Sequence, residues 1–357
     1  MQSAAVAVHA ALLLALLAPT ASAADKRCRL GSFSNANPPG PCWRPFSPAS
    51  PFNRPLPTHP RQAAGSPLIG SRTASFGLGP SFQAGTAGTV DDYSHPIYFA
   101  NRNAPRYRID CMSYSGCEIQ GRHIRIPRGA QPAGGSDGHL GVIDRRRKWE
   151  YDFWQVRDRS KQGGQLHVSY GGRTRIGTPG SKGLGSAATA AQFATSAGVI
   201  RPEELRAGRI DHALFMVVRC TNGHSVYPAK GPSTGRNCSE LGLPNKHAPA
   251  LGQHFYLDMS MRRIAALPVA GWKKTILAAM SRYGMFVGDT GGDGWGLQLW
   301  SGMGHAGGDP WVSLGRRLGL PSFGVGDSTR YVFDLRDVVD WGSVLRVARP
   351  CVSRRSC

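Results

Sequence analysis

The sequence lacks the local patterns that identify several large enzyme classes. It has no His-Glu-x-x-His helix and no P-loop, and no Gly-x-Gly-x-x-Gly run falls within an expected β-α-β unit. No Gly-x-Ser-x-Gly run connects an expected strand to an expected helix, as a nucleophile elbow requires. Serine-hydrolase, zincin and nucleotide-dependent chemistry are therefore not favoured. No Cys-x-x-Cys pair is present, so we do not expect structural zinc. We also expect no cofactor and no other metal.

Beyond its first residues the sequence also lacks an apolar run long enough to cross a membrane. The run near its start, "AAVAVHAALLLALLAPTASA", ends in the small residues Ala21, Ser22 and Ala23. This pattern predicts a secretory signal peptide over residues 1–23, although no basic residue precedes the run. A membrane anchor is the alternative, and the Pro-rich sequence that follows argues against it. We expect a secreted, extracellular protein.

The cysteines agree with export. They are eight, and they form four pairs of sequence neighbours. An even number of cysteines in an exported chain predicts a disulfide framework. We expect the pairs Cys28–Cys42, Cys111–Cys117, Cys220–Cys238 and Cys351–Cys357, although spacing alone does not determine connectivity.

Acidic residues are scarce. The 22 Asp and Glu residues face 43 Lys and Arg residues, which gives a net charge of +21. Such a charge favours anionic partners: acidic polysaccharide, cell-wall polymer, a phospholipid surface or nucleic acid. The basic residues are dispersed apart from the run at 145–148, and no nucleic-acid-binding motif accompanies them. We therefore expect a polysaccharide partner, possibly anionic, rather than nucleic acid.

Short alternating segments separated by Gly, Asn and Pro predict a mainly β fold, a jelly roll or β-sandwich with a few short helices. Expected strands cover 95–100, 122–127, 138–144, 149–156, 165–170, 211–218, 253–259 and 284–289. Helices are expected over 189–197, 201–207, 268–283 and 309–318, the first three followed by glycine. Residues 24–62 are predicted to form a Pro-rich arm, and 63–357 a single, monomeric β-rich domain.

The segment "KWEYDFWQV" is predicted to pair with "SDGHLGVID" in a hairpin. A four-residue loop over 144–147 would place Ile143 opposite Lys148, Gly141 opposite Glu150 and His139 opposite Asp152. The hairpin then has an apolar face and a polar face. The polar face would carry Asp137, His139, Gly141, Glu150, Asp152 and Trp154, and the apolar face Leu140, Val142, Trp149, Tyr151 and Phe153.

This polar face is suited to general acid–base chemistry. Residues two apart on a strand lie roughly 6.5–7 Å apart, and glycosidases use carboxyls separated by about 5–5.5 Å or about 6.5–9.5 Å. We assign Glu150 and Asp152 as acid, base or nucleophile and His139 as their proton partner. Asp137 and Trp154 would bind sugar. The alternative is that these are ordinary polar residues on the outside of a hairpin.

Two further segments contain candidate residues. Asp211 and His212 stand where a strongly apolar strand begins, a place where ionisable groups usually need a partner. A catalytic or substrate-binding role and a satisfied core role are both open. Asp289 begins the Gly-rich loop that leads to Trp295, and such loops often line binding sites. We include Asp289 as a catalytic candidate and Trp295 as a substrate-binding candidate.

Two resemblances accompany these residues. The segment Glu150-x-Asp152 resembles the Glu-x-Asp catalytic strand of laminarinase-type jelly-roll glycosidases, but the second Glu of that motif is replaced here by Trp154 or Gln155. The segments "AGVIRPEELRAGRIDHALFMVV", "YPA" and "RYGMFVGDTGG" resemble an uncharacterised family of secreted proteins, mainly from actinobacteria, over about residues 85–310. This second resemblance implies secretion and a single domain.

These observations favour a secreted carbohydrate-active enzyme, in the first place a glycoside hydrolase. A polysaccharide lyase acting on a uronate polymer is the alternative, because a basic surface suits that substrate and a histidine could abstract the C5 proton. A third possibility is a non-catalytic protein that binds cell wall or glycan.

Overall fold

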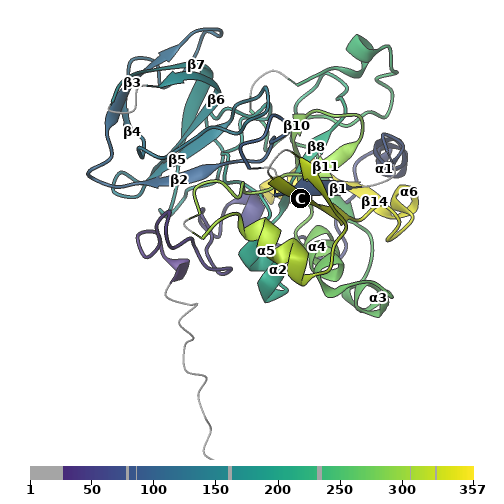
Figure 1. Ribbon diagram of the computed structural model, residues 1–357. Helices are drawn as coiled ribbons and strands as arrows, with labels where there is room; N and C mark the ends of the chain where they lie inside the picture. Colours follow the sequence, from purple (N-terminus) through teal and green to yellow (C-terminus); the bar gives the residue numbers. More distant parts are fainter. Residues whose placement is uncertain are drawn as a thin grey trace, which may run out of the picture.

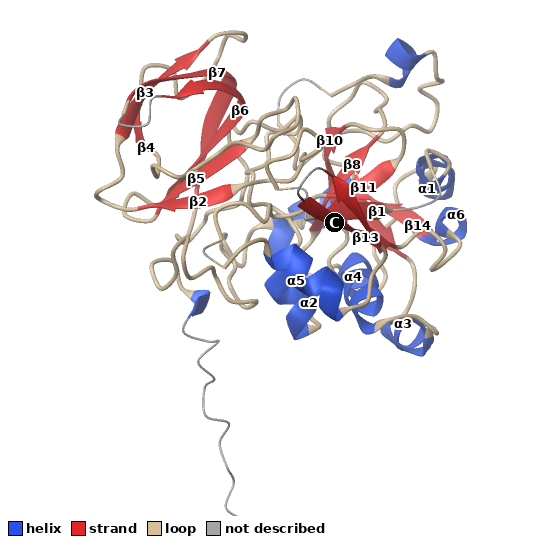
Figure 2. Ribbon diagram, in the orientation of Figure 1, coloured by secondary structure: helices blue, strands red, loops and turns tan. Residues whose placement is uncertain are grey.

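The computed structural model describes residues 27–77, 80–85, 87–159, 163–230, 235–305, 307–325 and 328–357. In these ranges the chain forms 14 strands in three sheets, with a few short helices (Figures 1 and 2). The predicted mainly β fold is confirmed, and its arrangement is consistent with a β-sandwich or jelly roll. The predicted signal peptide, residues 1–23, lies outside the described residues.

A six-stranded sheet curls into a half-barrel on one side of the molecule (Figure 1). Its strands, in spatial order, are β2 (Ile97–Ala100), β5 (Leu140–Asp144), β6 (Trp149–Arg159), β7 (Gly164–Arg175), β3 (Arg106–Cys111) and β4 (His123–Arg125). The concave face is filled by a core that includes Leu140, Val142 and Phe153. Because strand residues alternate between faces, Glu150 and Asp152 point out of this core, toward the rest of the protein.

The other side of the molecule contains two smaller sheets and most of the helices (Figure 2). The five-stranded sheet has the order β11 (Trp295–Leu297), β8 (Leu214–Val218), β10 (Met285–Thr290), β9 (His254–Leu257) and β14 (Leu345–Ala348). The three-stranded sheet has the order β1 (Ser81–Ala84), β13 (Ser328–Asp334) and β12 (Ser322–Val325). The helices are α1 (Ser66–Ala74), α2 (Pro202–Ala207), α3 (Met261–Ala266), α4 (Gly271–Arg282), α5 (Pro310–Arg317), α6 (Trp341–Val344) and α7 (Pro350–Arg354).

The N-terminal segment belongs to the larger core. Trp43, Phe46 and Phe52 are buried there with side chains of the five-stranded sheet, and a 3-10 turn forms at Pro51–Asn53. All four predicted disulfides are present: Cys28–Cys42, Cys111–Cys117, Cys220–Cys238 and Cys351–Cys357. The first of them closes the beginning of the Pro-rich segment.

The β5–β6 hairpin forms, but the predicted register is wrong by two residues. Asp144 lies opposite Trp149, Ile143 opposite Glu150 and Gly141 opposite Asp152. Asp144 remains in the strand because its carboxylate Oδ1 accepts hydrogen bonds from the backbone N–H groups of Arg146 and Arg147. The loop therefore covers 145–148. A shift of two residues leaves every side chain on the same face of its strand. The two faces therefore keep their predicted composition.

One predicted helix is absent. Residues 189–197 form an irregular segment that runs between the half-barrel and the five-stranded sheet. Its polar groups bond outside any helical pattern: Thr189 Oγ1 bonds both backbone groups of Phe193, and Ala191 N–H donates to the carbonyl of Gly288. The other three helices are confirmed as α2, α4 and α5, although α4 begins at Gly271 rather than at 268.

Candidate functional site

The carboxyl groups of Glu150 and Asp152 are fully buried, each residue being 0 % exposed. The irregular segment covers them. Ser196 donates its backbone N–H to Glu150 Oε1 at 2.7 Å and its hydroxyl to Oε2, and Thr195 donates its hydroxyl to Asp152. The part of the polar face formed by Glu150 and Asp152 therefore points neither to water nor into a groove. No polymeric substrate can contact these carboxyls in this structure.

Burial determines the charge state of this carboxyl pair. Desolvation raises the pKa of Glu150 to about 7, against hydrogen bonds from Ser196 that lower it. Desolvation, and next the charge of Glu150, raise the pKa of Asp152 well above its usual value. At neutral pH the pair therefore retains at least one proton, as closely spaced buried carboxyls do.

His139 lies beside a second histidine, His95, which the sequence did not single out. Their ring centroids are 5.2 Å apart, and the Nδ1 atom of His95 is 2.8 Å from the carbonyl oxygen of Thr195. Burial lowers the pKa of both rings, that of His95 to about 3, so both are neutral at pH 7. His139 is 5 % exposed, and its Nδ1 is a buried atom that lacks a hydrogen-bond partner among the described residues.

Asp137 and Trp154 lie at the edge of this buried region and are partly exposed. Trp154 donates its indole N–H to Asp137 Oδ1 at 3.2 Å. The Trp154 ring lies 5.8 Å from Tyr114, which is 56 % exposed, and Tyr114 in turn lies 6.4 Å from Tyr170. An aromatic surface thus adjoins the Asp137 carboxylate.

The backbone around Asp137 is held by β6. The N–H of Gln155 donates to the carbonyl of Asp137 at 2.8 Å, and the N–H of Val156 donates to that of Gly138. Gln155 adopts this position with a φ of 50°, a left-handed conformation that non-glycine residues seldom take. Such conformations often occur at functional sites.

Asp289 reaches the same region from the other sheet. It is partly buried near the end of β10, and its Oδ2 accepts a hydrogen bond from the N–H of Ala190 in the irregular segment. Burial raises the pKa of Asp289 to about 7, and the negative charge of Asp137 contributes to this rise. Asp137 and Asp289, 152 positions apart in the sequence (289 − 137), are therefore near enough for the charge of Asp137 to affect the Asp289 carboxyl.

A bulge in β10 sets the direction of Asp289. The pairing of β10 with β8 shifts between Val287 and Asp289, which leaves Gly288 unpaired. A Cβ atom on Gly288 would lie 2.2 Å from the ring of Phe215, so only glycine fits there. Bulges commonly redirect a side chain next to a functional site.

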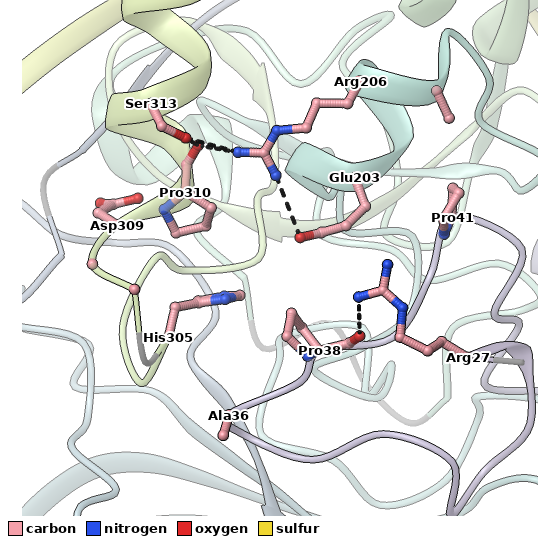
Figure 3. Close-up of a pocket in the computed structure, with 13 residues that line it drawn as sticks. Arg27, Ala36, Pro38, Pro41, Glu203, Arg206, His305, Asp309, Pro310 and Ser313 are labelled. Carbon is pink, nitrogen blue, oxygen red and sulfur yellow. Dashed lines mark hydrogen bonds and ion pairs between the residues drawn. The ribbon is translucent and has the colours of Figure 1, made fainter. Parts of the chain in front are cut away.

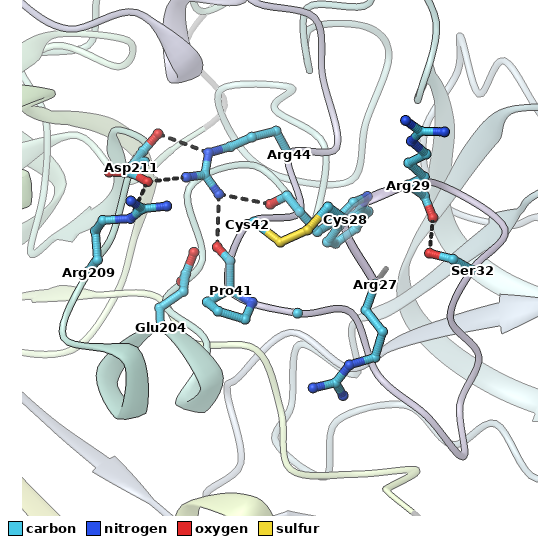
Figure 4. The surroundings of a disulfide bond; sticks show 12 residues. Arg27, Cys28, Arg29, Ser32, Pro41, Cys42, Arg44, Glu204, Arg209 and Asp211 are labelled. Carbon is cyan, nitrogen blue, oxygen red and sulfur yellow. Dashed lines mark hydrogen bonds and ion pairs between the residues drawn. A yellow bond between two sulfur atoms is a disulfide. The ribbon is translucent and has the colours of Figure 1, made fainter. Parts of the chain in front are cut away.

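Asp211 and His212 occupy a different place. Asp211 lies next to Arg44 of the N-terminal segment (Figure 4). The Nε2 atom of His212 lies 3.0 Å from Glu204 Oε1, and Asp211 forms ion pairs with Arg44 and Arg209, both at 2.7 Å. The fully buried Glu204 also pairs with Arg201. Burial raises the pKa of Glu204, but the charge of Arg201 and the contact with His212 outweigh it and lower the pKa to about 2. This network fastens the N-terminal segment, which favours the structural interpretation of both residues.

Trp295 is a core residue in this structure. It is 4 % exposed and packs edge-to-face on Trp341, with ring centroids 5.2 Å apart. Asp293, in the same Gly-rich loop, has a side chain that is 99 % exposed.

A cavity of about 510 Å³ lies between the N-terminal segment and helices α2 and α5 (Figure 3). Glu203, His305 and Asp309 line it. Glu203 pairs with Arg206 at 3.6 Å, and Asp309 caps α5 by accepting the N–H of Trp311. Glu203 and one oxygen of Asp309 thus have structural partners, whereas Asp309 Oδ2 is buried without a partner among the described residues. None of the described residues that line this cavity is Phe, Tyr or Trp.

Sequence reasoning singled out Asp137, His139, Trp154 and Asp289, which the structure brings to one junction. It missed His95, Thr195, Ser196 and the tyrosines Tyr114 and Tyr170. Thr195 and Ser196 were assigned to a helix. Tyr114 lies in the loop after β3, and Tyr170 lies opposite Trp154 on β7, a pairing that the sequence analysis did not consider. The position of His95 directly before an apolar strand was the one local signal available for it.

The described residues contain no group of three or more His, Cys, Asp or Glu side chains arranged to hold a metal ion. None of the helices in the described ranges has the length and apolar character needed to cross a membrane.

Comparison with known proteins found no matching family model, no matching curated protein and no matching solved structure. The resemblances noted from the sequence remain predictions, and the roles proposed below rest on this chain's own residues.

Proposed function

We propose that this protein is a secreted glycoside hydrolase acting on an extracellular polysaccharide, with Asp137 and Asp289 as its acid–base pair. The observation that carries this proposal is that Asp289, at the end of β10, lies near enough to Asp137, in the turn before β5, for the charge of Asp137 to help raise its pKa, and that the partly exposed Trp154 donates a hydrogen bond to Asp137. Most glycosidases use two carboxyl groups whose different environments give them different pKa values. The four disulfides support an extracellular location.

The two carboxyls differ in the way that the reaction needs. Asp289, with a pKa of about 7, can hold a proton at neutral pH and deliver it to the glycosidic oxygen as the C1–O bond breaks. Asp137, held as a hydrogen-bond acceptor by Trp154, would take a proton from the water that adds to C1. The rings of Trp154 and Tyr114 supply apolar surface for a sugar face.

In this proposal Asp137 and Asp289, and not Glu150 and Asp152 as first predicted, act as the acid and the base. Both buried carboxyls are held by the irregular segment, whose Ala190 also binds Asp289. Glu150 and Asp152 would then act on the site through its supporting segment and not through contact with substrate.

A polysaccharide lyase is the second candidate, and one observation favours it. His139 is neutral, and its Nδ1 has no hydrogen-bond partner among the described residues, but the atom is buried, so a lyase reaction requires a local opening that brings it to the substrate. In a lyase it would abstract the C5 proton of a uronate, and the leaving group would be eliminated with formation of a double bond.

The deciding experiment is turnover by the purified, oxidised protein on a panel of neutral and acidic polysaccharides. A hydrolase releases new reducing ends, whereas a lyase releases unsaturated products that absorb in the near ultraviolet. Asp137→Asn and Asp289→Asn should each lower hydrolysis by about 100-fold or more. Asp293→Asn, an exposed carboxylate of the same loop, is the matched control and should retain activity.

Absence of turnover on every polymer, or unchanged rates in both junction variants, would reject the proposal. Binding without turnover that also survives Glu150→Gln and Asp152→Asn would instead identify a non-catalytic glycan-binding protein.

A further inference from the structure

A second polar hollow, of about 410 Å³, lies at one end of the half-barrel. Its lining comes from the start of β4, the β5–β6 turn, β6 and β7: Gly121, Arg122, His123, Ile124, Arg147, Trp149, Tyr151 and Arg173. Trp149 and Tyr151 alternate along β6 with Glu150 and Asp152, so this hollow lies on the opposite face of the strand from the buried carboxyl pair. It is separate from the proposed catalytic junction.

The lining of this hollow is cationic. Three arginines face it, and none of the described lining residues is Asp or Glu. Arg122 is exposed and donates from Nε to the backbone carbonyl of Glu118, and no ion pair of its guanidinium occurs within the described ranges. Arg147 is half exposed and lies 3.9 Å from its nearest acid, Asp144. Positive charge at this hollow is thus incompletely neutralised by the protein itself.

The arginine-rich wall is held in place. Arg173 pairs with Glu118 at 2.6 Å, and its guanidinium lies 4.4 Å from the centre of the Trp149 ring. Arg175 lies 4.1 Å from the centre of the same ring. Cation–π contacts and the ion pair restrict these side chains, so less conformational entropy is lost when a ligand binds.

A guanidinium group offers planar paired donors that match a carboxylate. Single-stranded nucleic acid would instead need exposed aromatic faces on which bases stack. In this hollow Tyr151 is buried, and two guanidinium groups already lie over Trp149. The chemistry therefore favours a sugar chain that carries carboxylates over nucleic acid.

We propose that this hollow, the arginine pocket, binds the carboxylate groups of an acidic polysaccharide such as a uronate polymer. The proposal concerns binding and does not depend on the proposed hydrolysis, because the pocket lies away from Asp137 and Asp289. The arginine pocket would be one site at which the net positive charge of the protein contributes to binding.

The test is equilibrium binding of the full-length oxidised protein to polygalacturonate at pH 7 and low salt, with Asp289→Asn present in every sample to prevent turnover. Arg122→Gln combined with Arg147→Gln should weaken binding about tenfold, and added salt should weaken it further. The matched control removes the same charge elsewhere: Arg262→Gln with Arg263→Gln on α3, whose side chains are exposed. This control should retain affinity within about twofold.

Three results would overturn the proposal: no binding to polygalacturonate, equal losses in the two double variants, or equally tight binding of single-stranded DNA through the same arginines. Retained binding together with absent turnover in the otherwise wild-type protein would reject the hydrolase proposal while supporting this one.

Discussion

Ser196 binds both carboxyl oxygens of Glu150, the backbone N–H donating to Oε1 at 2.7 Å and the hydroxyl donating to Oε2. This contact joins the irregular segment to the middle of β6. Together with the hydroxyl of Thr195 on Asp152, it seals the polar face of the hairpin from solvent. Two residues that resemble catalytic acids in the sequence therefore join the half-barrel to the segment that also holds Asp289.

The burial of Glu150 predicts a pH-dependent stability. Its pKa is 4.5 in the unfolded chain and about 7 in the folded protein. Below pH 4.5 both states hold the proton and stability is complete. As pH rises toward 7 the unfolded state loses its proton first, so stability is lost. Between pH 4.5 and pH 8 the free energy of unfolding of the wild-type protein should fall by on the order of 3 kcal/mol through this effect. Glu150→Gln cannot ionise and should not show this fall.

Unfolding free energies from denaturant titrations at the two pH values measure this difference. Glu240→Gln, which removes an exposed carboxylate, is the control and should follow the wild-type protein. Parallel behaviour of Glu150→Gln and wild type between pH 4.5 and 8 would mean that Glu150 ionises equally in both states.

The Arg201–Glu204 pair predicts a different kind of stability change. Arg201 is 3 % exposed and donates to Glu204 and to the carbonyls of Gly40 and Trp43. Arg201→Met leaves a buried carboxylate without its main cation and should lower the free energy of unfolding by about 3–5 kcal/mol. Specific activity per folded molecule should remain, because this network lies outside the proposed site. A selective loss of kcat with unchanged stability would restore the catalytic interpretation of His212.

Local sequence patterns predicted the strands of the hairpin and the separation of its faces correctly, because period-two alternation is a local property. They could not show that Glu150 and Asp152 on the polar face are buried as well. That depends on residues 189–197, which lack helical bonding because their donors serve Glu150, Asp289 and Gly288. The register error has a similar origin: the Asp144 carboxylate caps the turn while its backbone remains in β5.

The candidate site was predictable residue by residue but not as an arrangement. Asp289 stood out because it precedes a Gly-rich loop, and Asp137 because it shares a strand face with His139. Their meeting requires the two sheets to pack through the irregular segment, a long-range contact that no local pattern encodes. The contact of His212 is local by comparison. Its partner Glu204 is only eight residues earlier, on helix α2.

The aromatic surface predicts a separation of binding from chemistry. Tyr114→Ala removes an exposed ring and should raise KM for a productive glycan about three- to tenfold while leaving kcat nearly unchanged. Trp154→Phe retains a ring but loses the donor to Asp137, and should lower kcat as well. Steady-state kinetics on the same polymer distinguish these effects. Equal effects of the two variants on both constants would contradict the assignment of Asp137 as the group that Trp154 orients.

The coupling of Asp137 to Asp289 predicts how activity depends on pH. If Asp289 donates the proton, the rate must fall as pH rises through about 7, where its carboxyl ionises. Asp137→Asn removes the negative charge that helps to raise this pKa, so Asp289 should ionise at lower pH in that variant. Carboxyl-carbon NMR titration detects this change without any need for turnover. Burial remains in the variant, so the pKa of Asp289 should still lie above 3.8. Asp293→Asn should leave the titration of Asp289 unchanged, and an equal displacement in that control would show that the two junction carboxyls do not interact directly.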